Sequence, residues 1–403
     1  MRFFSLIFFL LIQFGAKCTS AQEHFNLQDC IDSLARLHLQ ETNGVGFCVG
    51  INRNGIEEIF YYGGAQKDTL IFPVAKIRYP LGALSGTLTT TLFTEMFIRG
   101  DIGYDDPLQK YLPFNVTAPV YQKMVCKPLN ESGRSLGLQS DHTVRFTPYA
   151  CTPDENSLPQ PILLCYLATH TSGLPAFPNN LKQSKVDGLL YDAYTQNNLY
   201  EFLKSYQLSA PISYDYLYSP LGLAILGHIM SIHHQTAFET LLLDRVLRPL
   251  EMYSTGFLIQ EDTSVVVINE YAPFTKSIGH RFGDLFGPAN GMYSTIGDVM
   301  KFLSANIGNR GTELKDVLDY THNPRILLPI SESEDLEIAM GWNIRKLGDG
   351  ERRAVWQSST GDGSAIFLGF DEREKYGVVI LSAYGASVKD LGFSILKAMK
   401  GAE

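Results

Sequence analysis

Two groups of side chains in this chain of 403 residues have types and spacings that could do chemistry. Ser394 and Lys397 form a literal Ser-x-x-Lys sequence, and this spacing places an amine one helical turn from a hydroxyl, where it can take the hydroxyl proton. The pair falls in the expected closing helix, and we interpret it as coincidental. His228, His233 and His234 cluster without clear metal spacing or a nearby carboxylate triad, which favours a solvated turn over a zinc site. No His-Glu-x-x-His sequence or glycine-rich phosphate loop is present in the sequence.

The N-terminus and the composition predict an exported protein. Arg2 precedes an apolar run over 3–14, and a small-x-small ending predicts signal-peptide cleavage after Ala21. The run is too short to cross a membrane, which needs about 20 residues, and Lys17 before Cys18 disfavours lipidation. We therefore expect a secreted protein with no membrane anchor after cleavage. The net charge of −9 and the lack of a basic run make nucleic acid an unexpected partner.

Five cysteines remain after the expected cleavage, so at least one thiol is free or paired outside the chain. Cys126 and Cys151 bracket a polar stretch and are the favoured disulfide pair. Cys30 with Cys48 is the next expected pair, and Cys165 is expected to be a buried free thiol. Two N-glycosylation sequons begin in the same region, at Asn115 and Asn130.

Apolar periodicity predicts a helix and two strands first, helices and long loops next, and strands with a helix last. Asn54 and Gly55 form the turn pair of a tight hairpin between the first two strands. The expected elements are a helix over 27–39, strands over 44–51 and 56–62, helices over 87–98, 162–168, 199–206 and 221–232, strands over 365–370 and 376–382, and a helix over 388–399.

This order predicts a split α+β domain, in which the two ends of the chain build one lobe. After a signal peptide at 1–21, we expect a single domain over 22–403. Its α/β lobe would comprise about 22–80 and 290–403, and its helical lobe about 81–289. A loop insertion at about 114–160 is expected to cover or narrow the mouth of the cleft between the lobes.

Four segments, spread over nearly the whole expected mature chain, resemble motifs of the serine β-lactamase and penicillin-binding-protein family, in particular its class C and esterase-like branch. They are residues 100–113 (GDIGYDDPLQKYLP), 167–175 (LATHTSGLP), 290–298 (NGMYSTIGD) and 340–342 (MGW). The resemblance implies a β-lactamase/transpeptidase-like fold, with an antiparallel sheet flanked by N- and C-terminal helices and an inserted all-α lobe. Within these motifs we interpret His170 as a hydrogen-bonded loop residue and Asp298 as a helix cap, because such segments are mostly scaffold.

The resemblance also places the family's first motif, Ser-x-x-Lys at a helix N-terminus, on residues of this chain. With no gap before residue 100, Ala83 stands in the position of the serine and Gly86 in that of the lysine. Ser85 is two residues further, about 200° around a helix, and should face away. A second registration places residues 72–75 over the start of the motif, with Lys76 and Tyr79 inside it, and also lacks the serine.

The second and third motifs retain only part of the family pattern. Tyr218 matches the family's proton-relaying tyrosine, whereas Pro220 replaces the asparagine that would orient a substrate. Ser359 stands in the place of a basic residue, followed by the matching Thr360 and Gly361. A shift of one residue would instead put Ser358 in that place, so the basic group is missing under either alignment.

These losses predict a pseudoenzyme without cofactors. Its cleft would bind an unknown small-molecule, peptide or protein ligand, with Tyr218, Ser359, Thr360 and Gly361 as the binding residues. The alternative is an active serine-type esterase, amidase or peptidase in which Tyr218, Ser85 or Ser359 has taken over as nucleophile or water-positioning group.

Overall fold

The structure is a computed structural model that describes residues 26–43, 46–63, 77–128, 149–181, 194–213, 215–257, 266–267, 285–331, 334–347, 352–361, 364–382 and 384–400. The expected signal peptide at 1–21 and the sequon at Asn130 lie outside these residues. In the described part of the chain, no helix combines the length and the apolar character needed to span a membrane.

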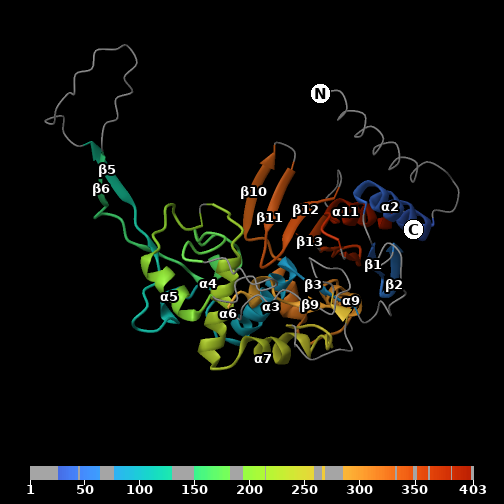
Figure 1. The fold of residues 1–403 in the computed structure, drawn as a ribbon, viewed down its shortest axis with the longest axis horizontal. Coiled ribbons are helices and arrows are strands. Elements are labelled where there is room, and N and C mark those ends of the chain that lie inside the picture. Colours follow the sequence, from blue (N-terminus) through green and yellow to red (C-terminus); the bar gives the residue numbers. More distant parts are fainter. Residues whose placement is uncertain are drawn as a thin grey trace, which may run out of the picture.

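One antiparallel sheet joins the first and last parts of the chain (Figure 1). In chain order its strands are β1 (Gly46–Arg53), β2 (Ile56–Gly63), β10 (Ile326–Ser331), β11 (Glu334–Ile338), β12 (Asn343–Lys346), β13 (Arg353–Thr360), β14 (Ala365–Asp371) and β15 (Tyr376–Ser382). Their order in space is β10-β11-β12-β13-β14-β15-β1-β2, so β1 pairs with β15 and places Cys48 opposite Leu381. Asn54 and Gly55 have φ of 52° and 86°, the left-handed values that the hairpin turn between β1 and β2 requires.

Helices cover both faces of this sheet. On one face, α2 (Leu27–Thr42) packs against α11 (Lys389–Met399), and their apolar residues join alternate residues of β1, β14 and β15 in one buried cluster. On the other face lie α3 (Ala83–Arg99) and α9 (Ile296–Asn306). Successive side chains of a strand point to opposite faces of the sheet. Because helices cover both faces, the residues of β1, β14 and β15 that point to either face are buried.

The middle of the chain forms the helical part of the molecule around α3 and α6. Its elements are η2 (Leu108–Lys110), α4 (Leu164–Ala168), α5 (Gln196–Ser205), α6 (Pro220–His234), α7 (Phe238–Leu242), a π-helical turn η3 (Leu243–Leu247), α8 (Gly287–Asn290) and α10 (Lys315–Thr321). A small sheet of order β8-β3-β9 adjoins them, with β8 (Val266–Val267), β3 (Ile77–Pro80) and β9 (Tyr293–Ser294). This α+β arrangement confirms the predicted fold class.

The described part of the insertion is a hairpin that points away from the body of the molecule (Figure 1). At its base β4 (Val120–Tyr121) pairs with β7 (Gln160–Pro161), and β5 (Met124–Pro128) then pairs with β6 (Tyr149–Pro153). Cys126 lies opposite Cys151, and the two form a disulfide. The direction of this hairpin gives no support to the expectation that the insertion covers the mouth of a cleft between the lobes.

The expected disulfide between Cys30 and Cys48 is wrong, because both residues are buried thiols. Cys30 lies on α2, which covers one face of the sheet, whereas the Cys48 side chain points to the opposite face and belongs to the core around α3. Its Sγ lies 3.5 Å from the Leu381 carbonyl oxygen. The sheet therefore separates two cysteines that are close in sequence. Cys165 is a buried free thiol, as expected.

Candidate functional site

The N-terminus of α3 is the place where the first-motif residues lie. Ala83 is the first residue of the helix and is 8% exposed. Gly82 precedes it with φ of 48° and no side-chain cap, a backbone conformation that a glycine adopts without strain. Tyr79, which the second registration would put in the motif, lies on the strand β3. Because the motif requires a helix N-terminus, the structure favours the registration that aligns Ala83 with the nucleophile.

Gly86, in the position of the lysine, faces a space that another side chain occupies. A Cβ atom added to Gly86 would lie 2.5 Å from Cδ1 of Leu223 and 3.7 Å from the carbonyl oxygen of Ala289. Leu223 is 1% exposed and lies on α6, so α3 and α6 pack together at this point. A lysine at residue 86 would therefore have to displace a buried leucine before its amine could reach a neighbour of Ala83.

Ser85 faces away from this position, in agreement with its place on the helix. Its side chain is fully buried, and its hydroxyl oxygen accepts a hydrogen bond of 3.2 Å from the Met292 backbone N–H. The hydroxyl is thus committed to the contact between α3 and the segment before β9.

On β13, Ser359 faces the N-terminus of α3. The Ser359 side chain contacts Gly82 so closely that a Cβ added to Gly82 would lie 2.8 Å from the Ser359 Cβ. Ser358 points to the other face of the sheet by strand alternation, so the geometry favours Ser359 over Ser358 in the third-motif position. Thr360 ends the strand and is exposed, and the N–H of Gly361 donates to the Ser364 carbonyl at 2.9 Å.

Tyr218 lies just before α6, in a buried aromatic environment. Its ring centroid is 4.5 Å from that of His170, and its hydroxyl is buried without a hydrogen-bond partner in the described part of the chain. Burial raises the pKa of this phenol above its usual value, so it stays protonated. Pro220 is the first residue of α6, and the Ser219 side chain caps that helix by accepting from the Gly222 N–H.

The N-termini of α3 and α6 lie close together because of the contact between Gly86 and Leu223. Each of the two residues is three positions after the first residue of its helix, Ala83 or Pro220. The first and second motif positions therefore meet at one end of the helix pair. Leu223 falls within the stretch that resembles the second motif, but the sequence assigned it no role, since an apolar residue in a buried helix carries no catalytic signature.

The remaining candidates serve structural roles. His170 accepts a hydrogen bond at Nδ1 from the Ser219 N–H, and burial lowers the pKa of its ring to about 4. Asp298 is not the cap of α9, because Thr295 is; Asp298 instead accepts hydrogen bonds from the Ser254 N–H and the Thr255 hydroxyl. This correction follows from its place in the first turn of the helix.

The Ser394 and Lys397 pair does not form a catalytic site, and the histidine cluster does not form a metal site in the described residues. Ser394 and Lys397 lie on α11, which packs on the face of the sheet opposite α3, and Ser394 Oγ donates to the Asp390 carbonyl. In the described residues, no group of three or more His, Cys, Asp or Glu side chains is arranged to hold a metal ion.

Comparisons with known proteins agree with this fold. A family model described as Beta-lactamase matches residues 31–392. A Beta-lactamase of Providencia stuartii is 22% identical over 300 residues, which cover 74% of this chain and 65% of the relative. A Beta-lactamase of Pseudomonas fluorescens is 23% identical over 284 residues, again covering 65% of the relative. The matched region thus spans just under two thirds of these relatives.

Solved structures superpose over nearly the whole chain. A class C β-lactamase has a TM-score of 0.68 at 16% identity, with 95% of this chain and 98% of that chain covered. A β-lactamase/D-alanine carboxypeptidase from Yersinia pestis, complexed with citrate, gives the same TM-score and identity, with 93% and 97% covered. At these identities the similarity establishes the fold.

Proposed function

The chain belongs to the Beta-lactamase family, and from that premise we propose that it is a secreted member that binds a ligand beside the α3 N-terminus without hydrolysing it through an acyl-enzyme. The observation that carries this proposal is the position of Leu223, whose methyl group lies where a side chain at Gly86 would begin. The place of the general base is therefore emptied by substitution, and the Leu223 side chain packs against it.

The other motif positions support the same proposal. An acyl-enzyme route needs a nucleophile and a base that activates it, whereas Ala83 offers a methyl group. Pro220 has no side-chain donor, and Ser359 has no positive charge. In a cooperative catalytic unit, the loss of one member already costs about 10⁴ to 10⁶ in rate.

The groups that remain suit a ligand that is held by neutral hydrogen bonds. The Ser359 hydroxyl lies beside the N-terminus of α3, and the Tyr218 hydroxyl is buried without a partner in the described residues. A buried polar group left unpaired costs about 1–3 kcal/mol, so a ligand that reached this hydroxyl would recover part of that energy. We expect a small molecule, a peptide or a segment of a protein partner.

A second candidate is a hydrolase with rewired residues, of the β-lactamase or D-alanine carboxypeptidase type that the relatives' names suggest. The specific observation in its favour is the contact of Ser359 with Gly82, which brings one hydroxyl to the N-terminus of α3. That helix end stabilises negative charge through its free N–H groups. Ser359 would be the nucleophile in this candidate.

Intact-mass analysis after incubation with a β-lactam and, separately, a fluorophosphonate ester distinguishes the two candidates. We expect no covalent adduct under conditions that fully label an active class C β-lactamase. Native mass spectrometry of the same samples then reports any non-covalent complex. A stoichiometric adduct that disappears in Ser359→Ala but persists in Ser358→Ala would refute the non-catalytic proposal and establish the rewired hydrolase.

A further inference from the structure

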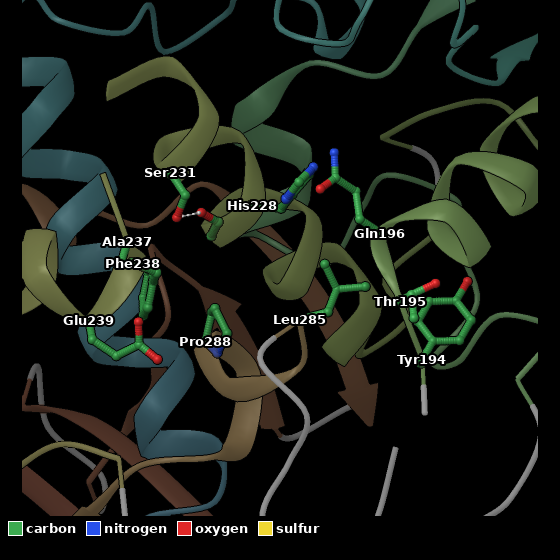
Figure 2. A pocket seen from close by; sticks show the side chains of 11 residues that line it. Tyr194, Thr195, Gln196, His228, Ser231, Ala237, Phe238, Glu239, Leu285 and Pro288 are labelled. Atoms are coloured by element: carbon green, nitrogen blue, oxygen red, sulfur yellow. Dashed lines mark hydrogen bonds between the residues drawn. The ribbon is translucent and has the colours of Figure 1, made fainter. Parts of the chain in front are cut away.

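A pocket of about 540 Å³ opens in the helical part of the molecule, at the junction of α5, α6, α7 and α8 (Figure 2). Its volume falls within the range of about 300–1,000 Å³ that is typical of small-molecule sites. The residues that matter here are His228 and Ser231 of α6, Phe238 and Glu239 of α7, Leu285, and Pro288 of α8.

The pocket is separate from the site at the α3 N-terminus. Leu223, Gly227 and Ser231 follow one another at intervals of four residues and so share one face of α6. Leu223 contacts Gly86, whereas Gly227 and Ser231 line the pocket. Pro288 packs directly against α6 at Gly227, between the pocket and the Leu223 contact, since the Pro288 Cβ lies 2.6 Å from the position of a Cβ added to Gly227. A ligand in the pocket therefore need not touch Ala83.

One wall of the pocket is apolar and well packed. Phe238 and Leu285 are 7% and 9% exposed, and Pro288 has a rigid ring. Figure 2 shows Phe238 and Pro288 on one side of the pocket, and His228 and Gln196 together on another. Flat apolar side chains of this kind suit an aromatic ring.

The opposite wall holds a hydrogen-bonded chain that ends at the pocket. Gln196 Nε2 donates to the Tyr200 hydroxyl oxygen at 2.6 Å, and this hydroxyl lies 2.9 Å from Nε2 of His228. Burial lowers the pKa of His228 to about 4, so the ring is neutral near pH 7. With the Tyr200 proton directed to Nε2, the single ring proton is on Nδ1, which makes no hydrogen bond with the described residues and can donate to a ligand.

The negative charge of Glu239 indicates which ligands the pocket favours. Among the described residues that line the pocket, Glu239 is the charged one and is exposed, and none is a lysine or an arginine. A carboxylate in the ligand would meet Glu239 without a compensating cation, whereas an amine would be attracted to it.

We propose that this pocket binds a small aromatic molecule that is neutral or carries an amine, with its ring against Phe238 and Pro288 and a polar atom at His228. The three indoles tryptamine, tryptophol and indole-3-acetate test this, because they share one ring and differ in charge. Ligand-observed NMR with the full chain should give saturable binding of tryptamine and tryptophol. Indole-3-acetate should bind about fivefold more weakly than tryptamine, as expected for a partly exposed carboxylate.

Two variants with matched controls locate the binding. Ser231→Phe fills the pocket and should abolish binding, whereas Ser394→Phe should retain it. Both serines are half-buried helical residues that donate to the carbonyl four residues earlier, at 3.1 Å and 2.8 Å. Glu239→Lys, on the surface, should reverse the preference between tryptamine and indole-3-acetate, and Glu313→Lys, an exposed residue outside the pocket, should not.

The proposal is overturned if neither tryptamine nor tryptophol binds saturably, or if Ser231→Phe binds them as the unchanged chain does. An unchanged order of the three indoles in Glu239→Lys overturns the charge preference. These readouts are independent of covalent labelling at the α3 N-terminus, so the pocket and the proposed function can fail separately.

Discussion

The contact between Gly86 and Leu223 predicts a specific non-additivity in stability. In Gly86→Ala the new Cβ would lie 2.5 Å from Leu223 Cδ1, a distance that forces the helices or the leucine to shift. Overpacking of this kind costs about 1–3 kcal/mol, and alanine returns up to about 1 kcal/mol through its higher helix propensity. The single variant should therefore lose between about 0 and 2 kcal/mol of the free energy of unfolding.

The same substitution should change sign once the leucine is truncated. Leu223→Ala removes a buried side chain and should cost about 2–5 kcal/mol. In that background Gly86→Ala places its methyl group in the vacated space, so it should stabilise by about 1 kcal/mol. The expected coupling energy between the two sites is then about 1–3 kcal/mol.

Urea denaturation, monitored by circular dichroism, measures the free energies of unfolding in this double-mutant cycle. Gly297→Ala in α9 is the matched control, because a Cβ there meets no atom closer than 4.0 Å. Gly297→Ala and Leu223→Ala should add within about 0.5 kcal/mol, as distant sites do. If Gly86→Ala and Leu223→Ala also add within that margin, Leu223 does not fill the place of the lysine side chain, and the main support for the proposed function is lost.

Three further predictions concern charge, backbone and pH. Glu95 is 1% exposed and pairs with Arg245 at 3.0 Å as well as with Arg99, so Arg245→Met should lower the free energy of unfolding by about 1–3 kcal/mol. Arg248→Met, which breaks an exposed pair on the following turn, should cost less than about 1 kcal/mol, and equal losses would contradict the argument. Gly82→Ala should cost about 1–3 kcal/mol in a thermal melt, because its φ of 48° and the contact with β13 both oppose a side chain. His170 has a folded pKa of about 4, below its unfolded value of 6.5, so its contribution to stability is present above pH 6.5 and is lost as the pH falls toward 4. His170→Asn should therefore reduce the slope of the unfolding free energy against pH in this range by up to about 1.4 kcal/mol per pH unit. An unchanged slope would contradict the assignment.

Local signals in the sequence predicted the hairpin of β1 and β2, and most of the other predicted elements formed within a few residues of their expected positions. The start of α3 was expected at residue 87 and lies at Ala83. Gly82 caps this helix without a side-chain hydrogen bond, so the usual N-cap signature is missing. Strands β10 to β13 were not identified individually. The segment of β10 contains Pro329 and that of β11 carries three acidic residues, both of which are unusual in strands.

The packing at the place of the lysine could not be predicted, for a different reason. Motif alignment showed that Gly86 lacks a side chain, but it could not show what stands in its place. Leu223 is 137 residues further along the chain, and one apolar residue of a buried helix looks like any other. The Cys30–Cys48 prediction failed similarly, because closeness in sequence does not reveal which face of a sheet each residue lies on.

The pairing of β1 with β15 has a consequence for the order in which this protein can form. Cys48 and Leu381 are 333 residues apart in the chain and adjacent in the sheet, so the central strands cannot pair until almost the whole chain has been synthesised. Domains emerge from the ribosome N-terminus first, and β1 and β2 therefore wait as an isolated hairpin, which is marginally stable in water. The helices around α3 and α6 are complete much earlier and have local partners. Folding during synthesis should thus begin in the middle of the chain, and its slowest step should be the joining of the two ends.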